Sequence, residues 1–244
     1  MTTAVTTTDL EVRYGDVVAL SGLTMSLPAG ASLAVVGSNG SGKSTLLGAL
    51  AGTIKPSAGT IEVVGKAPSL VLQATEVDET LPITVRDTVK LARYPSVGLL
   101  RRFSDADNDA VNHALKRMDA ADLAESRLHE LSGGQRQRVL MAQGLAQDSQ
   151  VLLLDEPMTG LDVASRGLVL DVIGAETADG RTVVMTTHSL SDAEACDLVL
   201  LLRTTPIAFG TPSTTLVESN LRTAFGHHVI RVGEETIVDD HHVH

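Results

Sequence analysis

The sequence has little of what several classes of protein require. A single cysteine, Cys196, excludes an internal disulfide framework and is typical of a reducing compartment, and we expect it to be buried. Met1–Asp9 is rich in threonine and lacks the apolar core of a secretory signal. The longest aliphatic stretches, such as Leu198–Leu202, fall far short of the roughly 18 residues of a membrane-spanning helix. These absences predict a soluble, cytoplasmic chain whose membrane role would come through a partner.

Positive charge is also scarce. The chain carries 19 Lys and Arg against 30 Asp and Glu, a formal net charge of −11. Because a nucleic-acid partner usually needs a basic face, we expect no nucleic acid as a partner. With 43% hydrophobic residues among 244, the chain is long enough to bury a sizeable core.

The hydrophobic pattern predicts an α/β fold. Strand-like segments lie at Val5–Tyr14, Val17–Leu27, Ser32–Val36, Thr60–Val64, Leu70–Leu72, Val151–Leu154, Thr182–Thr186 and Leu198–Leu202. The first two, divided by Tyr14-Gly15-Asp16, predict an N-terminal antiparallel β subdomain. Residues 74–147, approximately, have mostly helical character, with Val111, Leu115 and Met118 on one helical face. The later strands alternate with helices, which predicts a mostly parallel sheet with an inserted α-helical subdomain.

A glycine-rich loop lies between the Ser32–Val36 strand and a predicted helix over Lys43–Ala51. Its residues are Gly37, Ser38, Asn39, Gly40, Ser41, Gly42, Lys43, Ser44 and Thr45. This is the P-loop pattern, in which backbone N–H groups and the helix N-terminus bind phosphates. We expect Lys43 to neutralise β- and γ-phosphate charge and Ser44 to bind Mg²⁺. The sequence therefore predicts ATP and Mg²⁺ as ligands.

Two carboxylates follow the apolar strand Val151–Leu154. Side chains at the carboxyl end of a strand face the ligand crevice of an α/β sheet. We expect Asp155 to hold Mg²⁺ and Glu156 to act as general base on the attacking water. An isolated Asp-Glu pair would be two surface acids, but the apolar strand and the P-loop together favour the catalytic interpretation.

A third motif, Leu131-Ser132-Gly133-Gly134-Gln135, precedes a predicted helix that runs to about Gln147. Ser132 would cap that helix in any protein. The same geometry also presents N–H groups and a hydroxyl to a phosphate.

These three motifs, in this order, resemble the ATP-binding subunits of ABC transporters. The resemblance spans about Val5 to Thr215 and implies an ATPase domain over residues 1–225, built on a P-loop NTPase core. It implies that Tyr14 stacks on adenine and that Gln73 contacts Mg²⁺ and the attacking water. It also implies that His188 contacts the γ-phosphate and holds Glu156. Without the resemblance, each would be an ordinary strand-end residue.

The resemblance further implies a homodimer with two ATP molecules sandwiched between the copies. Ser132 and Gly134, with Gly133 and Gln135, would reach the γ-phosphate held by the other copy. The loop Gly160-Leu161-Asp162 would let the copies sense each other, although Asp162 can also simply cap the next helix. Expected partners are transmembrane permease subunits and, indirectly, an extracytoplasmic substrate-binding protein. The chain would then lie on the inner face of the cell membrane.

The substrate is indicated by a weaker similarity. Arg93-Tyr94-Pro95 and Gly98-Leu99-Leu100-Arg101-Arg102 are similar to zinc- and manganese-type importer ATPases. The alternative is a loop with a proline turn and a solvated basic patch. The similarity favours import of a divalent metal ion. An iron–siderophore complex, an amino acid or another small solute remains an alternative cargo, as does a soluble ABC ATPase with no transport role.

The segment 226–244 is a histidine-rich tail. Its histidines are His227, His228, His241, His242 and His244. Clustered imidazoles bind Zn²⁺, Cu²⁺ or Ni²⁺, and Asp239 and Asp240 could add oxygen ligands. The alternative is a polar terminus without a ligand.

Overall fold

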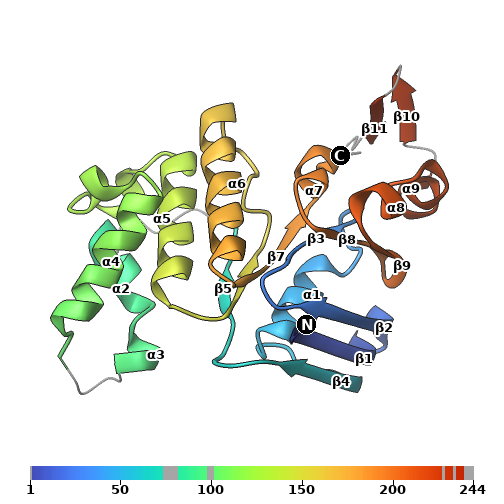
Figure 1. The fold of residues 1–244 in the computed structure, drawn as a ribbon, viewed down its shortest axis with the longest axis horizontal. Coiled ribbons are helices and arrows are strands. Elements are labelled where there is room, and N and C mark those ends of the chain that lie inside the picture. The colour runs from blue at the N-terminus through green and yellow to red at the C-terminus, as the bar shows by residue number, and fades with distance from the viewer. Residues whose placement is uncertain (1, 74–81, 98–101, 227–228, 233–234, 239–244) are drawn as a thin grey trace.

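The computed structural model describes residues 2–73, 82–97, 102–226, 229–232 and 235–238 (Figure 1). A six-stranded sheet in the order β5-β6-β7-β3-β8-β9 forms its centre. Its strands are β3 (Ser32–Val36), β5 (Ser69–Val71), β6 (Val151–Leu154), β7 (Thr182–Thr187), β8 (Leu198–Arg203) and β9 (Thr205–Gly210). All neighbouring pairs are parallel except β8 and β9.

An antiparallel sheet in the order β2-β1-β4 lies beside the central sheet. It consists of β1 (Thr3–Tyr14), β2 (Val17–Pro28) and β4 (Ala58–Val63). The chain turns at Gly15 with a φ of 60°, a conformation that glycine adopts without strain. The expected N-terminal antiparallel sheet is therefore present, and β4 is its third strand.

The central strands separate two apolar clusters because successive side chains point to opposite faces of a strand. On β3, Ala34 and Val36 belong to the cluster that includes the helices α2, α4, α5 and α6, whereas Leu33 and Val35 pack with β1, β2 and α1. Both faces of the sheet are therefore covered, as the nearly continuous apolar composition of these strands requires.

Helices form most of the chain outside the sheets. They are α1 (Lys43–Leu50), α2 (Val85–Leu91), α3 (Tyr94–Val97), α4 (Asp105–Arg117), α5 (Gly133–Ala146), α6 (Val163–Ala178), α7 (Leu190–Glu194), α8 (Pro212–Thr215) and α9 (Glu218–Phe225), with 3-10 helices at Ala121–Leu123 and Leu128–Glu130. Figure 1 shows α2 to α5 gathered on one side of the molecule, with α6 between them and the central sheet. Val111, Leu115 and Met118 are fully buried there, as their spacing predicts. No helix in the described ranges is both long and apolar enough to cross a bilayer.

The predicted fold class is confirmed: a mostly parallel sheet, an antiparallel N-terminal sheet and a helical insertion are all present. Three of the strands are absent from the sequence prediction: β9 and the two strands of a hairpin near the C-terminus. β9 contains Pro206, and it is a strand because it pairs antiparallel with β8 at the edge of the sheet, where proline is tolerated. A hairpin of β10 (Val229–Val232) and β11 (Glu235–Val238) lies within the segment expected to be a tail.

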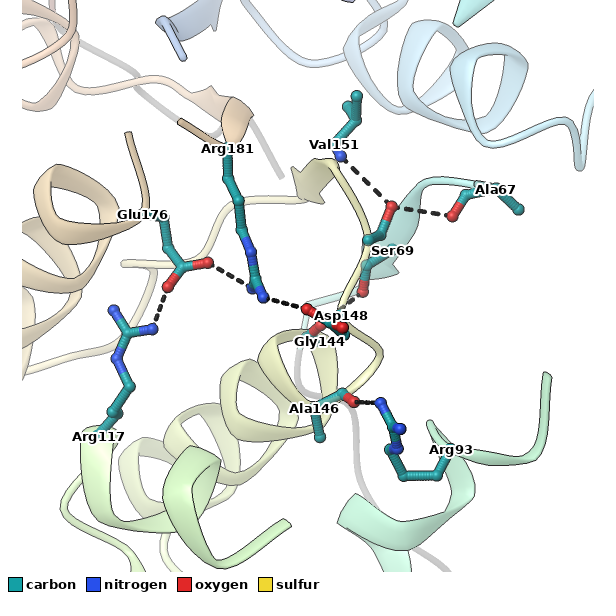
Figure 2. A network of polar contacts seen from close by, with 11 residues as sticks. Ala67, Ser69, Arg93, Arg117, Gly144, Ala146, Asp148, Val151, Glu176 and Arg181 are labelled. Carbon is teal, nitrogen blue, oxygen red and sulfur yellow. Dashed lines mark hydrogen bonds and ion pairs between the residues drawn. The ribbon is translucent and has the colours of Figure 1, made fainter. Parts of the chain in front are cut away.

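A chain of ion pairs joins the helical side to the central part of the molecule (Figure 2). Glu176 on α6 is almost fully buried and binds both Arg117 of α4 and Arg181, which precedes β7. Arg181 also binds Asp148, just beyond α5, at 2.6 Å. Arg93 donates to the carbonyl oxygen of Ala146, the last residue of α5, at 3.0 Å. These contacts hold the C-terminal end of α5 against its surroundings.

Candidate nucleotide-binding site

Four parallel strands bring the candidate residues to one edge of the central sheet. The registers pair Val36 with Thr187 and Val71 with Leu154, so β3, β7, β5 and β6 end at about the same level. The P-loop follows β3, and His188 follows β7. Gln73 lies just beyond the end of β5, and Asp155 follows β6. The carboxyl edge of a parallel sheet is the usual position of a ligand site in α/β proteins.

The P-loop is folded into a cradle at the N-terminus of α1. The buried ammonium group of Lys43 donates to the carbonyl oxygens of Gly37 and Ser38, at 2.8 and 3.1 Å. Gly42 has a φ of 99°, and a Cβ atom there would lie 2.5 Å from the carbonyl oxygen of Ala19, so the turn requires glycine. The loop borders a cavity of about 280 Å³, lined by Ala19, Asn39, Gly40, Ser41, Gly42, Lys43, Ser44, Thr45 and Glu156.

Two of the three side chains predicted to bind Mg²⁺, Ser44 and Asp155, are in contact at this edge of the sheet. The Ser44 hydroxyl donates to Asp155 Oδ1 at 3.2 Å, although the two residues lie far apart in the sequence. The Thr186 hydroxyl donates to the same oxygen at 2.6 Å. The Ser44 hydroxyl and the Asp155 carboxylate therefore bring two hard oxygen ligands together, which is the ligand chemistry that Mg²⁺ prefers.

Glu156, the predicted general base, lines the P-loop cavity. Its Oε2 atom accepts a hydrogen bond from the Thr159 hydroxyl at 3.1 Å and lies 3.9 Å from His188 Nδ1. Its backbone is left-handed, with a φ of 46°. Glu156 also lines a second cavity together with His188. A carboxylate beside a phosphate cradle, with an imidazole next to it, can orient and deprotonate a water molecule.

Tyr14 stands at the other side of the loop. Its hydroxyl oxygen lies 3.5 Å from Thr45 Oγ1, and the side chain is 53% exposed. The ring is therefore beside the phosphate cradle and open to a planar ligand. Gln73, two residues beyond the end of β5, is exposed at the same edge of the sheet as Asp155.

The Leu131–Gln135 motif lies elsewhere. None of the described residues lining the P-loop cavity comes from it. The Ser132 hydroxyl accepts from the Gln135 N–H at 3.3 Å, and the Gln135 side chain accepts from the Ser132 N–H at 2.9 Å, so Ser132 does cap α5. Leu161 Cδ2 lies 3.5 Å from the position of a Cβ on Gly134, which brings the Gly160-Leu161-Asp162 loop beside this helix start.

Asp162 caps α6. Its Oδ1 atom accepts from the Ser165 N–H at 2.8 Å, and this hydrogen bond lowers the pKa of the Asp162 carboxyl. The next side chain, Val163, is 89% exposed. We call Ser132, Gly133, Gly134, Leu161 and Val163 the signature face. Three of its members, Ser132, Gly133 and Gly134, are predicted site residues. None of the five lines the P-loop cavity, although Leu161 lines a neighbouring cavity together with Glu156 and His188.

Several residues that support the site are not indicated by the motifs. Thr186 and Thr187 end β7, and the Thr187 hydroxyl donates to Asp192 at 3.3 Å. Asp192 is buried and accepts from Arg166 of α6 at 2.6 Å. This network fixes the segment that carries His188. The available sequence signal is two threonines at the carboxyl end of an otherwise apolar strand.

The tail histidines lie outside the described residues. Within the part of the chain that the structure describes, no group of three or more His, Cys, Asp or Glu side chains is arranged to hold a metal ion. Cys196 is buried as expected, and desolvation raises the pKa of its thiol to about 12.

Comparisons with known proteins agree with this geometry. Residues 20–159 match the family model described as ABC transporter. The chain is 38% identical over 213 residues to the chelated iron transport system membrane protein YfeB of Yersinia pestis, covering 83% of this chain and 72% of the relative. It is 35% identical over 228 residues to the manganese transport system ATP-binding protein MntA of Synechocystis, covering 89% of this chain and 88% of that relative.

A solved structure shares the fold. This is a chain from a metal-chelate type ABC transporter in an inward-facing conformation, with a TM-score of 0.84 and 32% identity, covering 94% of this chain and 90% of that one. Together with the family match and the joined P-loop, Asp155 and Glu156, it shows that the chain belongs to the ABC transporter family and is an ATP-binding subunit with ATPase activity.

Proposed function

We propose that the chain powers the import of a divalent metal ion through a separate membrane channel. The observation that supports the metal substrate is the similarity to a manganese transport ATPase over 89% of the chain. The iron and metal-chelate relatives point to the same chemical class. Of the two ions expected from the sequence, manganese is favoured over zinc because a relative with that substrate matches.

Each site residue has a proposed role in ATP hydrolysis. The P-loop N–H groups and Lys43 bind the β- and γ-phosphates. Ser44, Asp155 and Gln73 would hold Mg²⁺, which would neutralise phosphate charge when bound. Glu156 takes a proton from the attacking water, and His188 holds the Glu156 carboxylate in position relative to the γ-phosphate. Tyr14 stacks on adenine.

The signature face is proposed to complete the site of a second copy. Its support is the separation from the P-loop cavity together with the exposure of Ser132, Gly133 and Val163. In a head-to-tail homodimer, Ser132 and Gly134 would contact ATP held by the P-loop of the partner copy.

We further propose permease subunits and, through them, an extracytoplasmic substrate-binding protein as partners, with this chain on the inner face of the membrane. Large exposed apolar side chains at Leu72, Leu91 and Tyr94 support a docking role for the region around the end of β5 and the helices α2 and α3.

A chelated iron complex is the second candidate substrate. The Yersinia pestis relative, named for chelated iron transport, is 38% identical and supports it. One experiment distinguishes the candidate substrates. It measures the uptake of radiolabelled manganese, zinc and chelated iron by cells lacking this chain. Complementation uses the native chain, Glu156→Gln and, as a matched control, Glu218→Gln on the exposed face of α9.

The expected result is loss of manganese uptake in the deletion strain, restored by the native chain and by Glu218→Gln but not by Glu156→Gln. Loss of chelated iron uptake alone would assign the second candidate. Unchanged handling of all three metals would refute the proposed metal substrate.

A regulatory or buffering role for the tail histidines is also a proposal, supported only by composition. A chain truncated after Gly226 should bind fewer Zn²⁺ ions than the full chain in isothermal titration calorimetry. Equal binding by the two forms would assign the tail no metal.

A further inference from the structure

Thr186 joins the two acidic residues of the site. It is the next-to-last residue of β7 and is fully buried. Its hydroxyl donates to Asp155 Oδ1 at 2.6 Å and accepts from the backbone N–H of Glu156 at 2.8 Å. One hydroxyl therefore contacts the predicted Mg²⁺ ligand through its proton and the predicted general base through its oxygen.

The contact with Glu156 falls on a strained segment. The φ of 46° at Glu156 lies in the left-handed region, which a residue with a Cβ atom adopts at an energetic cost. Such a conformation persists only where neighbouring groups hold it. The Asp155 N–H is bound to the Val71 carbonyl oxygen at 2.8 Å, and the Glu156 N–H to Thr186. Successive backbone groups are thereby fixed from two neighbouring strands, and the direction of the Glu156 side chain follows from them.

We propose that Thr186 is a positioning residue for ATP hydrolysis, whose hydroxyl sets the orientation of the Asp155 carboxylate and holds the Glu156 backbone in its left-handed conformation. This inference rests on the proposed roles of Asp155 and Glu156. Valine has nearly the shape of threonine but lacks the hydroxyl, so Thr186→Val leaves the Glu156 N–H without its acceptor. A partly buried N–H in that state is unfavourable, and the strained peptide can relax by rotating. The Glu156 carboxylate then moves away from the position of the attacking water.

The same strand offers a matched control. Thr182, at the opposite end of β7, is also buried, and its hydroxyl accepts from the backbone N–H of Gly30 at 3.0 Å. Thr182→Val therefore removes the same kind of hydrogen bond from the same strand, but away from the site. A purely structural role of Thr186 predicts equal effects of the two valine variants.

The experiment compares the full chain with Thr186→Val, Thr186→Ser and Thr182→Val in ATP hydrolysis, in binding of a fluorescent ATP analogue and in urea unfolding. We expect Thr186→Val to lower kcat on the order of 100-fold, the effect of misplacing a catalytic group by about 1 Å. Affinity for the nucleotide measured without Mg²⁺ should stay within about two-fold, because the residues of the phosphate cradle are unchanged, whereas Asp155, which Thr186 orients, is a predicted Mg²⁺ ligand. Thr186→Ser should restore most of kcat, and Thr182→Val should keep it while losing comparable stability.

A kcat of Thr186→Val equal to that of Thr182→Val would overturn the inference. If Thr186→Val fails to fold, Thr186→Ala and Thr186→Ser make the same comparison of hydroxyl loss against hydroxyl retention. Glu156→Gln is measured in parallel: if it retains turnover, the assignment of the base is wrong. If Glu156→Gln is inactive and Thr186→Val is fully active, only the role of Thr186 is wrong.

Discussion

Glu176→Gln provides the sharpest test of the ion-pair chain between the helical side and the central sheet. The Glu176 carboxylate is 1% exposed, whereas the side chains of Arg117 and Arg181 are 21% and 26% exposed. The substitution keeps the size of the side chain but places an amide NH₂ group, a donor, against guanidinium donors. Removing one partner of a buried ion pair costs about 3–5 kcal/mol. Because water can reach part of both arginines, we expect the lower end, about 3 kcal/mol of unfolding free energy.

Urea unfolding followed by circular dichroism measures this loss, with Glu218→Gln as the control. Glu218 also pairs with an arginine, Arg222, at 2.8 Å, but its side chain is 49% exposed on the surface of α9. An exposed pair of this spacing contributes only about 0.3–0.5 kcal/mol. A loss in Glu176→Gln no larger than that in Glu218→Gln would refute the reasoning that the buried carboxylate joins the two parts of the molecule.

Three further outcomes are expected. A Cβ atom on Gly144 would overlap the Val71 side chain. Overpacking costs about 1–3 kcal/mol and the helix propensity of alanine offsets up to about 1 kcal/mol of this, so Gly144→Ala should lower the unfolding free energy by up to about 2 kcal/mol. Gly174 on α6 has open space around it, so Gly174→Ala should raise the unfolding free energy by up to about 1 kcal/mol. Equal changes in urea unfolding would contradict this. Burial raises the pKa of the Cys196 thiol from 9.0 to about 12, so the reactive thiolate should be about 1000-fold rarer in the native chain than in urea. Alkylation by iodoacetamide, followed by mass spectrometry, should be slower by the same factor. Comparable rates in the two conditions would mean that the thiol is accessible in the native chain. Hydrogen bonds from Ser104, and then from Arg93, lower the pKa of Asp107 from 3.8 to about 2, so the stabilising contribution of its carboxylate is present above about pH 4 and is lost as the pH falls through 2. Asp107→Asn should therefore weaken the dependence of the unfolding free energy on pH in this range, whereas Asn at the exposed Asp109 should not. Identical pH curves for the two variants would argue against this role of Asp107.

The parts of the site that are contiguous in sequence could be predicted. The P-loop, the Asp155-Glu156 pair and the Ser132 cap each depend on a few successive residues whose geometry is local. The apolar strands could be located for the same reason, since alternation and β-branched residues are local signals. That the Leu131–Gln135 motif contacts ATP held by a second copy stays a prediction, which rests on the resemblance to the family.

Features that depend on residues far apart in sequence could not be predicted. Pro206 argues against a strand, and only the pairing of β9 with β8 at the sheet edge overrides it. Nothing near Thr186 in the sequence indicates that its hydroxyl contacts Asp155, because β6 and β7 become neighbours only in the folded sheet. The burial of Glu176 between two arginines likewise follows from the packing of α6 against α4 and the start of β7.

The two ends of α5 are attached to different parts of the molecule, because Arg138, near its N-terminal end, binds Asp119, just beyond α4, at 2.9 Å. Its C-terminal end is bound by Ser69 through the Gly144 carbonyl oxygen, by Arg93 through Ala146 and by Arg181 through Asp148. Its other end presents the exposed Ser132 and Gly133. A helix of 14 residues is about 21 Å long, so a tilt of about 10° about the bound end would displace Ser132 by about 4 Å. If the signature face contacts a phosphate as proposed, such a tilt would be enough to bring it into or out of hydrogen-bonding range.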